Sequence, residues 1–273
     1  MENKHLTYNL YDDKITLTFD DKKHWYFANG EYVPSVTGVT KYLDKSGPLM
    51  GWAVKTVLGW LQEQLKPGEV VGELQLHKLF EEAKKKHREY KEDAATIGGL
   101  IHKWIQGYIE FQLGATDKEP EKPIDEAIKN GVKAFLHWEQ ENKLKYLFAE
   151  KKIFSKKYNY AGTCDLIAEL NGKLSVIDFK TGSGPWYEHA IQISAYRQAL
   201  QEELKMKIKE RWILKVDKET GKFHAHKATL HKEDFKCFLA LLEIYRRHRL
   251  GILTKEKPYN QYCLLYTSPS PRD

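Results

Sequence analysis

Two aspartates and a lysine lie in two short segments that a tight turn separates. The segments are residues 163–170 and 173–180, with Asn171-Gly172 between them. Asn-Gly is the strongest short-range signal for a two-residue type I′ turn, so the segments are predicted to pair as a hairpin. Residues whose numbers sum to 343 then face each other, which places Asp165 opposite Asp178.

This pair of carboxylates predicts a metal site. Side chains alternate along a strand, so Lys180 shares the face of both aspartates. Carboxylates roughly 5 Å apart on paired strands repel each other unless a cation lies between them, and a hard divalent cation suits oxygen ligands. The alternative is a solvated surface hairpin. Apolar residues on both faces favour a buried central pair instead, and these are Leu166, Ile167, Val176, Ile177 and Phe179.

Three motifs follow one another along the chain: Gly162-Thr-Cys-Asp165, Asp178-Phe-Lys180 and Gln192-Ile-Ser-Ala-Tyr196. In type and order they resemble the Gly-x-x-Asp, Asp-x-Lys and Gln-x-x-x-Tyr motifs of the PD-(D/E)XK nucleases, specifically their RecB-like branch. Upstream, Gly98-Gly-Leu-Ile-His102 resembles the histidine-bearing helix of that branch. Phage exonucleases and mitochondrial genome maintenance exonucleases are the members that this chain looks like.

The resemblance implies an α/β fold with a restriction-endonuclease-like core, in which helices flank a central mixed β-sheet. It also implies that His102, Asp165, Asp178 and the main-chain carbonyl of Phe179 bind Mg²⁺ or Mn²⁺. Lys180 would then orient the attacking water or offset the charge that develops on the phosphate. A structural ion pair is the alternative role for Lys180.

Two further residues have open interpretations. A helical histidine among apolar neighbours, as His102 is, is more often a hydrogen-bonded core residue than a ligand, and only the resemblance favours the metal. Glu150 precedes the hairpin on another predicted strand, where a place in the site and a surface role are both compatible with the sequence.

Gln192 and Tyr196 are four residues apart and therefore share one face of a predicted helix. The resemblance implies that this helix flanks the active site, where the two side chains would contact the DNA backbone or hold Lys180 and the metal ligands in place. Packing of Tyr196 between helix and sheet is the alternative.

The chain has three cysteines and no Cys-x-x-Cys pair. Several RecB-like relatives use four cysteines to bind an iron–sulfur cluster, so no such cluster is expected here. Cys164 and Cys237 are predicted to be small buried hydrophobic residues. Cys263 begins an 11-residue tail, 263–273, which resembles a translated sequencing adapter and is treated as non-native.

The composition is typical of a globular protein, with 41% hydrophobic and 30% charged residues. The sequence shows no apolar run long enough to span a bilayer and no signal peptide, so no membrane partner is expected. Few cysteines indicate a reducing compartment, the cytoplasm, or the host cytoplasm if a phage encodes the chain. The net charge of +6 suits a polyanionic partner, although lysine-rich surfaces are also common as solvated surfaces.

Hydrophobic periodicity and turn residues predict the organisation of the chain. Residues 1–92 form an amino-terminal part, with a β-meander over 6–33 and added helices, packed on a nuclease core at 93–262. Helices are predicted at 35–43, 49–65, 73–92, 93–113, 123–142, 186–204 and 235–250. Strands are predicted at 147–154, 162–170, 173–180, 211–216 and 222–230.

We therefore expect a Mg²⁺- or Mn²⁺-dependent deoxyribonuclease, an exonuclease for single-stranded or frayed DNA ends that acts in phage DNA replication, recombination, repair or processing. Its expected partners are DNA and a phage recombinase, single-strand-binding protein or helicase. A duplex exonuclease and a structure-specific endonuclease are alternatives. A DNA-binding accessory protein that does not cleave is an alternative of another class, which the intact Asp165, Asp178 and Lys180 disfavour.

Overall fold

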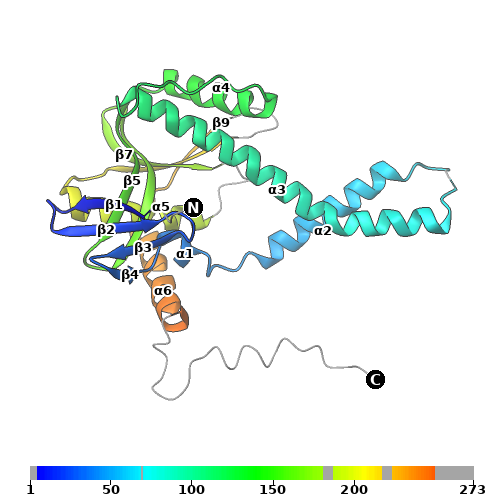
Figure 1. Ribbon diagram of the computed structural model, residues 1–273, viewed down its shortest axis with the longest axis horizontal. Coiled ribbons are helices and arrows are strands. Elements are labelled where there is room, and N and C mark those ends of the chain that lie inside the picture. Colours follow the sequence, from blue (N-terminus) through cyan, green and yellow to red (C-terminus); the bar gives the residue numbers. More distant parts are fainter. Residues whose placement is uncertain (1–4, 69, 181–186, 217–222, 250–273) are drawn as a thin grey trace, which may run out of the picture.

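The computed structural model describes residues 5–68, 70–180, 187–216 and 223–249. These residues form a four-stranded sheet, a five-stranded sheet and six helices (Figure 1). The predicted α/β architecture, with a mixed sheet flanked by helices and an amino-terminal meander, is confirmed. The predicted non-native tail, 263–273, lies outside the described residues.

The amino-terminal sheet is an antiparallel meander, as predicted over 6–33. Its strands follow the chain order β1-β2-β3-β4. At the turn between β3 and β4, Asn29 and Gly30 have φ values of 50° and 86°, the left-handed conformations that a type I′ turn requires. The strands are β1 (His5–Leu10), β2 (Ile15–Asp20), β3 (Trp25–Ala28) and β4 (Glu31–Val33).

The central sheet has the order β5-β6-β7-β8-β9, with β7 and β8 parallel and the other neighbours antiparallel. Pairing between β6 and β7 runs from Leu170↔Lys173 to Leu166↔Ile177, so the predicted hairpin register is confirmed. It ends one residue short of Asp165 and Asp178. The strands are β5 (Leu144–Ser155), β6 (Tyr160–Leu170), β7 (Lys173–Lys180), β8 (Glu210–Val216) and β9 (Phe223–Lys227).

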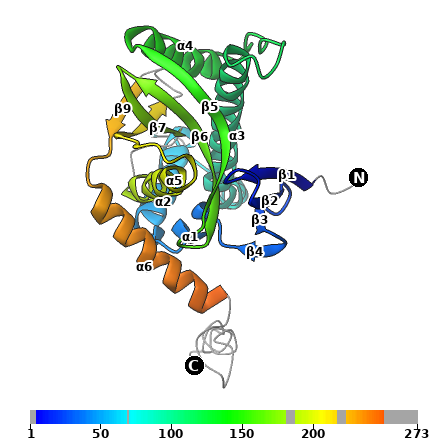
Figure 2. The ribbon, with the colours of Figure 1, turned by 90° about the vertical axis from the view of Figure 1, so that its left-hand side faces the viewer.

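Helices cover both faces of this sheet, as Figure 2 shows. The helices α3 (Glu73–Gln112) and α4 (Glu126–Glu141) pack on one face, where Ile101 and Phe135 are fully buried. The other face is covered by α5 (Tyr187–Leu204), with α1 (Val36–Thr40) and α6 (His231–Arg249) packed beside it. The meander forms a third cluster with Phe154 and Ala161, near the turn between β5 and β6.

Helix α3 is one continuous helix of 40 residues. The prediction of separate helices at 73–92 and 93–113 is therefore wrong. Residues 73–97, which span the predicted boundary, contain no glycine or proline. Exposed ion pairs three residues apart, such as Lys84–Glu81 and Lys86–Glu89, are compatible with an unbroken helix. Helix α3 crosses residue 92, and the division into parts 1–92 and 93–262 stays a prediction.

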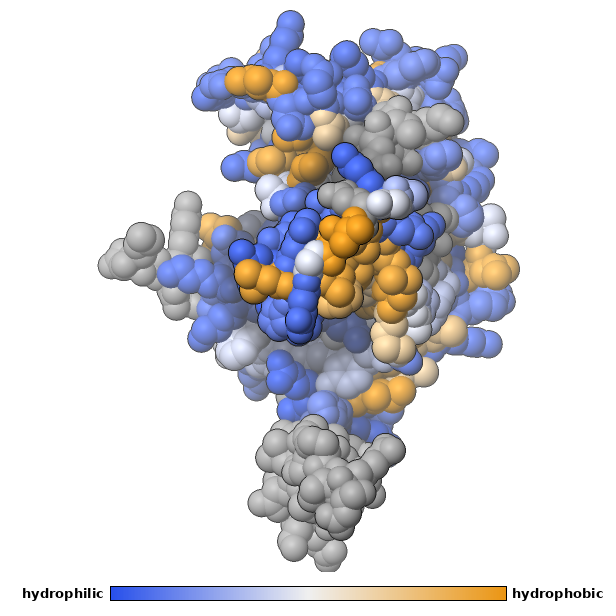
Figure 3. All heavy atoms as spheres, turned by 90° about the vertical axis from the view of Figure 1, so that its right-hand side faces the viewer, coloured by the Kyte–Doolittle hydropathy of each residue, from blue (hydrophilic) through white to orange (hydrophobic). Residues whose placement is uncertain are grey.

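The first half of α3 and α2 (Ser46–Gln64) form a helical hairpin that projects away from the sheets (Figure 1). We call this hairpin the arm. No residue of α2 is buried. Met50, Val54 and Leu58 are spaced four residues apart and are 64%, 58% and 54% exposed. Figure 3 shows apolar side chains gathered at this end of the molecule.

Cys164 is buried in the sheet, as predicted, but Cys237 is exposed, so its predicted burial is wrong. The reason is the phase of α6. Its buried residues recur every three to four positions, and Cys237 lies two residues after the buried Phe235, on the opposite side of the helix. Among the helices of the described residues, none is long and apolar enough to cross a lipid bilayer.

Candidate active site

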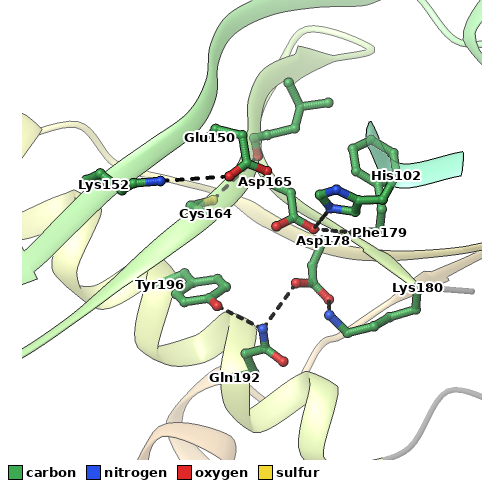
Figure 4. Close-up of polar contacts among 11 residues, drawn as sticks. His102, Glu150, Lys152, Cys164, Asp165, Asp178, Phe179, Lys180, Gln192 and Tyr196 are labelled. Atoms are coloured by element: carbon green, nitrogen blue, oxygen red, sulfur yellow. Dashed lines mark hydrogen bonds and ion pairs between the residues drawn. The ribbon is translucent and has the colours of Figure 1, made fainter. Parts of the chain in front are cut away.

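Three adjacent strands each contribute one carboxylate to the same part of the central sheet. Residue numbers in the β5–β6 pairs flanking the site sum to 315, as in Ala149↔Leu166, so Glu150 lies opposite Asp165. The β6–β7 register brings Asp178 to the next position across. Figure 4 shows the resulting row of Glu150, Asp165 and Asp178.

The alternation of side chains along β6 is interrupted at Asp165. Leu166 belongs to the cluster under α3, whereas Cys164 belongs to the cluster under α5, although residues two apart on a regular strand share one face. Glu150, opposite the interruption, has φ of 46°, a conformation uncommon for residues other than glycine. With this irregularity, Asp165 contacts a residue of α3 while Asp178 contacts a residue of α5.

Helix α3 places His102 against Asp165. The Nε2 atom of His102 lies 3.1 Å from Asp165 Oδ2, and the Phe179 amide donates a 2.9 Å hydrogen bond to the same oxygen. Burial alone lowers the pKa of His102, but the hydrogen bond to Asp165 and the nearby carboxylates raise that pKa to about 9. Burial raises the pKa of Asp165, and His102 outweighs burial and holds the pKa below its usual value. At neutral pH the two form an imidazolium–carboxylate pair.

Asp178 is fully buried and contacts Lys180 and Gln192. Its Oδ2 lies 2.5 Å from the Lys180 ammonium, and its Oδ1 accepts a 3.3 Å hydrogen bond from Gln192 Nε2. The amide of Gln192 also donates to the Tyr196 hydroxyl at 2.8 Å. Burial, reinforced by repulsion from Asp165, raises the pKa of Asp178 to about 6 although Lys180 opposes the shift. Gln192 and Tyr196 of α5 thus lie beside the site, and Tyr196 also packs between α5 and the sheet.

Glu150 joins the site through contacts between distant parts of the chain. Donor atoms of Glu150, His102 and Asp165 all lie within 4.8 Å of one another. Burial and repulsion from Asp165 raise the pKa of Glu150 to about 7. The sequence left its position open. The turn residue Asn159, with φ of 48°, is the signal that could have located Glu150. A hairpin closed at this turn pairs residues whose numbers sum to 315, which places Glu150 opposite Asp165.

This donor set fits a divalent cation. The two half-buried carboxylates suit Mg²⁺ or Mn²⁺, and His102 would join them only as the neutral imidazole, because a bound ion displaces the imidazolium proton. Within the described residues, the group whose donors converge is His102, Glu150 and Asp165. Asp178 lies beside them with its charge directed at Lys180. The predicted ligand set of His102, Asp165, Asp178 and Phe179 stays a prediction.

Comparisons with known proteins give one family. The model of the PD-(D/E)XK nuclease superfamily matches residues 51–264. The search among curated proteins found no match.

Solved structures show remote similarity to this chain, and three of them serve as examples. An alkaline exonuclease (LHK-Exo) from Laribacter hongkongensis is 13% identical, with a TM-score of 0.29 over 54% of this chain and 82% of that chain. The structure of SSO0001 is 13% identical, with a TM-score of 0.28 over 79% and 91% of the two chains. LHK-Exo in complex with dAMP is 14% identical, with a TM-score of 0.27 over 54% and 83%.

Proposed function

The chain belongs to the PD-(D/E)XK nuclease superfamily, and from this premise we propose that it is a divalent-metal-dependent exonuclease for single-stranded or frayed DNA ends. One observation carries the proposal: three adjacent strands bring Glu150, Asp165 and Asp178 into one row, in which Asp165 pairs with His102 and Asp178 pairs with Lys180. This arrangement combines a site for a metal with a charged lysine beside it. Cleavage within duplexes or at branched structures would use the same groups.

The residues that would hold Mg²⁺ or Mn²⁺ are His102, Glu150 and Asp165, with Asp178 and the carbonyl of Phe179 beside them. When bound, such an ion would polarise the phosphodiester and lower the pKa of its water ligand toward neutrality. The Phe179 amide holds one oxygen of Asp165, which leaves the other oxygen of that carboxylate free to turn toward an ion.

Lys180 is the residue that we assign to the reacting phosphate. Burial lowers its pKa, but Asp178 and Asp165 outweigh burial and raise the pKa above its usual value, so the ammonium stays charged at neutral pH. An ammonium carries three donors, and one of them is directed at Asp178. The others can orient the attacking water and offset charge that develops on the phosphate.

We further propose that the enzyme acts in phage DNA replication, recombination or repair, in the cytoplasm of the host cell. A recombinase, a single-strand-binding protein or a helicase is the proposed protein partner. The resemblance of the motifs to phage exonucleases supports this role, and the net charge of +6 is compatible with DNA as the substrate.

Digestion of end-labelled single-stranded, duplex and circular DNA in Mg²⁺, Mn²⁺ or EDTA tests the proposal. We expect metal-dependent loss of linear but not circular DNA. Asp178→Ala and Lys180→Ala should each lower the rate at least about 100-fold, because each removes charge that acts on the reacting groups. The matched control is Lys173→Ala, which removes an ammonium paired with Glu210 near the turn of the same hairpin.

Circular dichroism and DNA retention in EDTA should show that both variants stay folded and bind DNA. Cleavage by either variant near the wild-type rate would contradict the assignment of these residues. A folded wild-type protein that retains DNA and yields no product in any metal would instead be the accessory protein.

A further inference from the structure

A groove lies between the two sheets where edge strand β1 approaches edge strand β5. Its volume is about 460 Å³, within the range of sites that hold a small ligand. Residues 7–10 line it from β1 and residues 148–152 line it from β5. Figure 2 shows β1 beside β5. The groove is therefore formed jointly by the meander and the central sheet. The catalytic chemistry described above assigns the meander no role.

The groove and the catalytic site share Glu150. This residue lines the groove and is also one of the three residues whose donor atoms converge for a metal. Its conformation is left-handed, with φ of 46°, which is uncommon for a residue with a side chain. A molecule in the groove would therefore lie next to a group bound at the carboxylate row.

Lys152 supplies a positive charge at this junction. Its side chain is 11% exposed, and its ammonium lies 3.9 Å from Glu150 Oε2 (Figure 4). The same nitrogen lies 5.0 Å from the ring centroid of Phe19 and 5.8 Å from that of Tyr8. Within the described part of the chain, it donates no hydrogen bond. Aromatic faces and one distant carboxylate hold the cation in place and leave its donors available.

The walls of the groove suit a nucleotide. Phe148, 38% exposed, lines the groove from β5 and Tyr8 lines it from β1, and sequence-tolerant stacking on aromatic rings binds unpaired bases. The Lys151 ammonium lies 5.3 Å from the centroid of the Phe148 ring. A phosphate oxygen is a natural acceptor for a buried ammonium with free donors. The neighbouring Lys151 differs, because its ammonium is already bound to Glu203 at 2.8 Å.

We propose that the β1–β5 groove binds the nucleotide next to the scissile phosphate of a single DNA strand, and that Lys152 donates to a phosphate oxygen of that nucleotide. This inference rests on the proposed nuclease function, because it takes the carboxylate row as the place of cleavage. It assigns the meander the role of a wall for the substrate strand.

Binding of a short fluorescent single-stranded oligonucleotide, measured by anisotropy in EDTA, tests the contact without cleavage and without a metal at Glu150. Lys152→Met should raise Kd about tenfold, because a charge-assisted hydrogen bond is lost. It should also lower the slope of log Kd against log salt by about 0.7, the contribution of one phosphate contact on a single strand. Lys173→Met, which removes an exposed ammonium far from the groove, should change neither quantity.

Oligonucleotides with one phosphate at a time replaced by a neutral methylphosphonate locate the contact. The wild-type protein should bind more weakly when the phosphate at one position near an end of the oligonucleotide is replaced. Lys152→Met should bind that oligonucleotide as well as it binds the unmodified one. This coupling separates a direct contact from a general effect on folding. If Lys152→Met does not fold, Phe148→Ser, which removes an aromatic ring from the same β5 wall of the groove, is measured instead, and a severalfold rise in Kd is expected.

The groove proposal would be contradicted if Lys152→Met bound DNA with wild-type affinity, or if it still lost affinity on methylphosphonate replacement at that position. Either result would leave the nuclease proposal standing. If Lys152→Met fails to fold, unchanged binding by Phe148→Ser would overturn the groove proposal equally. A wild type that shows the coupling but cleaves no DNA in Mg²⁺ or Mn²⁺ would overturn the nuclease proposal and support the groove as a DNA site.

Discussion

Each carboxylate of the site has at least one partner, both the buried Asp178 and the half-buried Asp165 and Glu150. His102 and the Phe179 amide hold Asp165, Lys180 and Gln192 hold Asp178, and Lys152 is the cation beside Glu150. Because an unpaired buried charge is costly, these partners explain how three carboxylates can share one small volume. Removing one partner should therefore disturb one carboxylate and leave the others in place.

Gln192→Leu should test this for Asp178. The substitution removes the amide that donates to Asp178 Oδ1 and to the Tyr196 hydroxyl. We expect kcat to fall about 10- to 100-fold, as for other residues that orient a ligand, with KM for DNA changed less than threefold. Gln198→Leu on the same helix, where the amide donates to Glu202, is the control and should retain activity. Equal kcat in the two variants would show that Gln192 only fills space.

The residue-scale geometry was predictable where it depends on local pairing. The Asn-Gly turn fixes the β6–β7 register, so the neighbouring positions of Asp165 and Asp178 follow from the sequence. The place of Glu150 depends on a second turn and on an irregular strand, and alternation alone does not predict such an irregularity. The aromatic neighbours of the Lys152 ammonium come from the meander, which is distant in sequence, so its surroundings do not follow from local pairing.

At the scale of helices and strands, the sequence predicted types better than ends. The start of α4 shows why. Residues 123–142 were predicted as helical, but the helix begins after Asp125, whose carboxylate accepts hydrogen bonds from the Ala127 and Ile128 amides. Such a cap satisfies free amides at one position, whereas periodicity averages over several turns.

Gly131→Ala should weaken the packing of α4 on α3. A methyl group there would lie 2.6 Å from Ile101 Cδ1, 3.0 Å from its Cγ1 and 3.2 Å from its Cγ2, so the whole of this fully buried side chain would have to shift. Alanine improves helix propensity by about 1 kcal/mol, but overpacking typically costs 1–3 kcal/mol, so we expect a net loss of about 1 kcal/mol. Chemical denaturation measures the free energy of unfolding.

Gly107→Ala is the matched control on α3. The added methyl group would lie 3.7 Å from the nearest atom, an ordinary contact with Pro120. Only the gain in helix propensity remains, so the free energy of unfolding should rise by about 0.5–1 kcal/mol. Stabilisation by both substitutions would show that the two helices can separate at Gly131 without cost.

At the scale of the whole molecule, the two sheets and the arm differ in how much buried apolar packing stabilises them. The central sheet has a buried cluster on each face, and the meander has a third. Helix α2 has no buried residue and contacts α3 along one side. Local stability follows the density of buried apolar contacts, so the arm should open more readily than the rest.

Hydrogen exchange measured by mass spectrometry should show this difference. Amides of α2 should exchange at least about 100-fold faster than those of α3 near Ile101, Ile105 and Ile109, equivalent to about 2.7 kcal/mol in opening free energy. The three isoleucines are at most 1% exposed, which is why they serve as the reference. Equal protection in the two regions at low protein concentration would contradict the expectation.

Helix α3 carries both His102 and one half of the arm, with no break between them. The direction in which the arm points is thus tied to the histidine by helical phase. Inserting one residue into α3 before His102 would turn the arm by about 100° around the helix axis, whereas inserting seven would restore its bearing within about 20°. Relatives that vary the length of this segment would aim the same arm at different surroundings while the geometry at His102 stays the same.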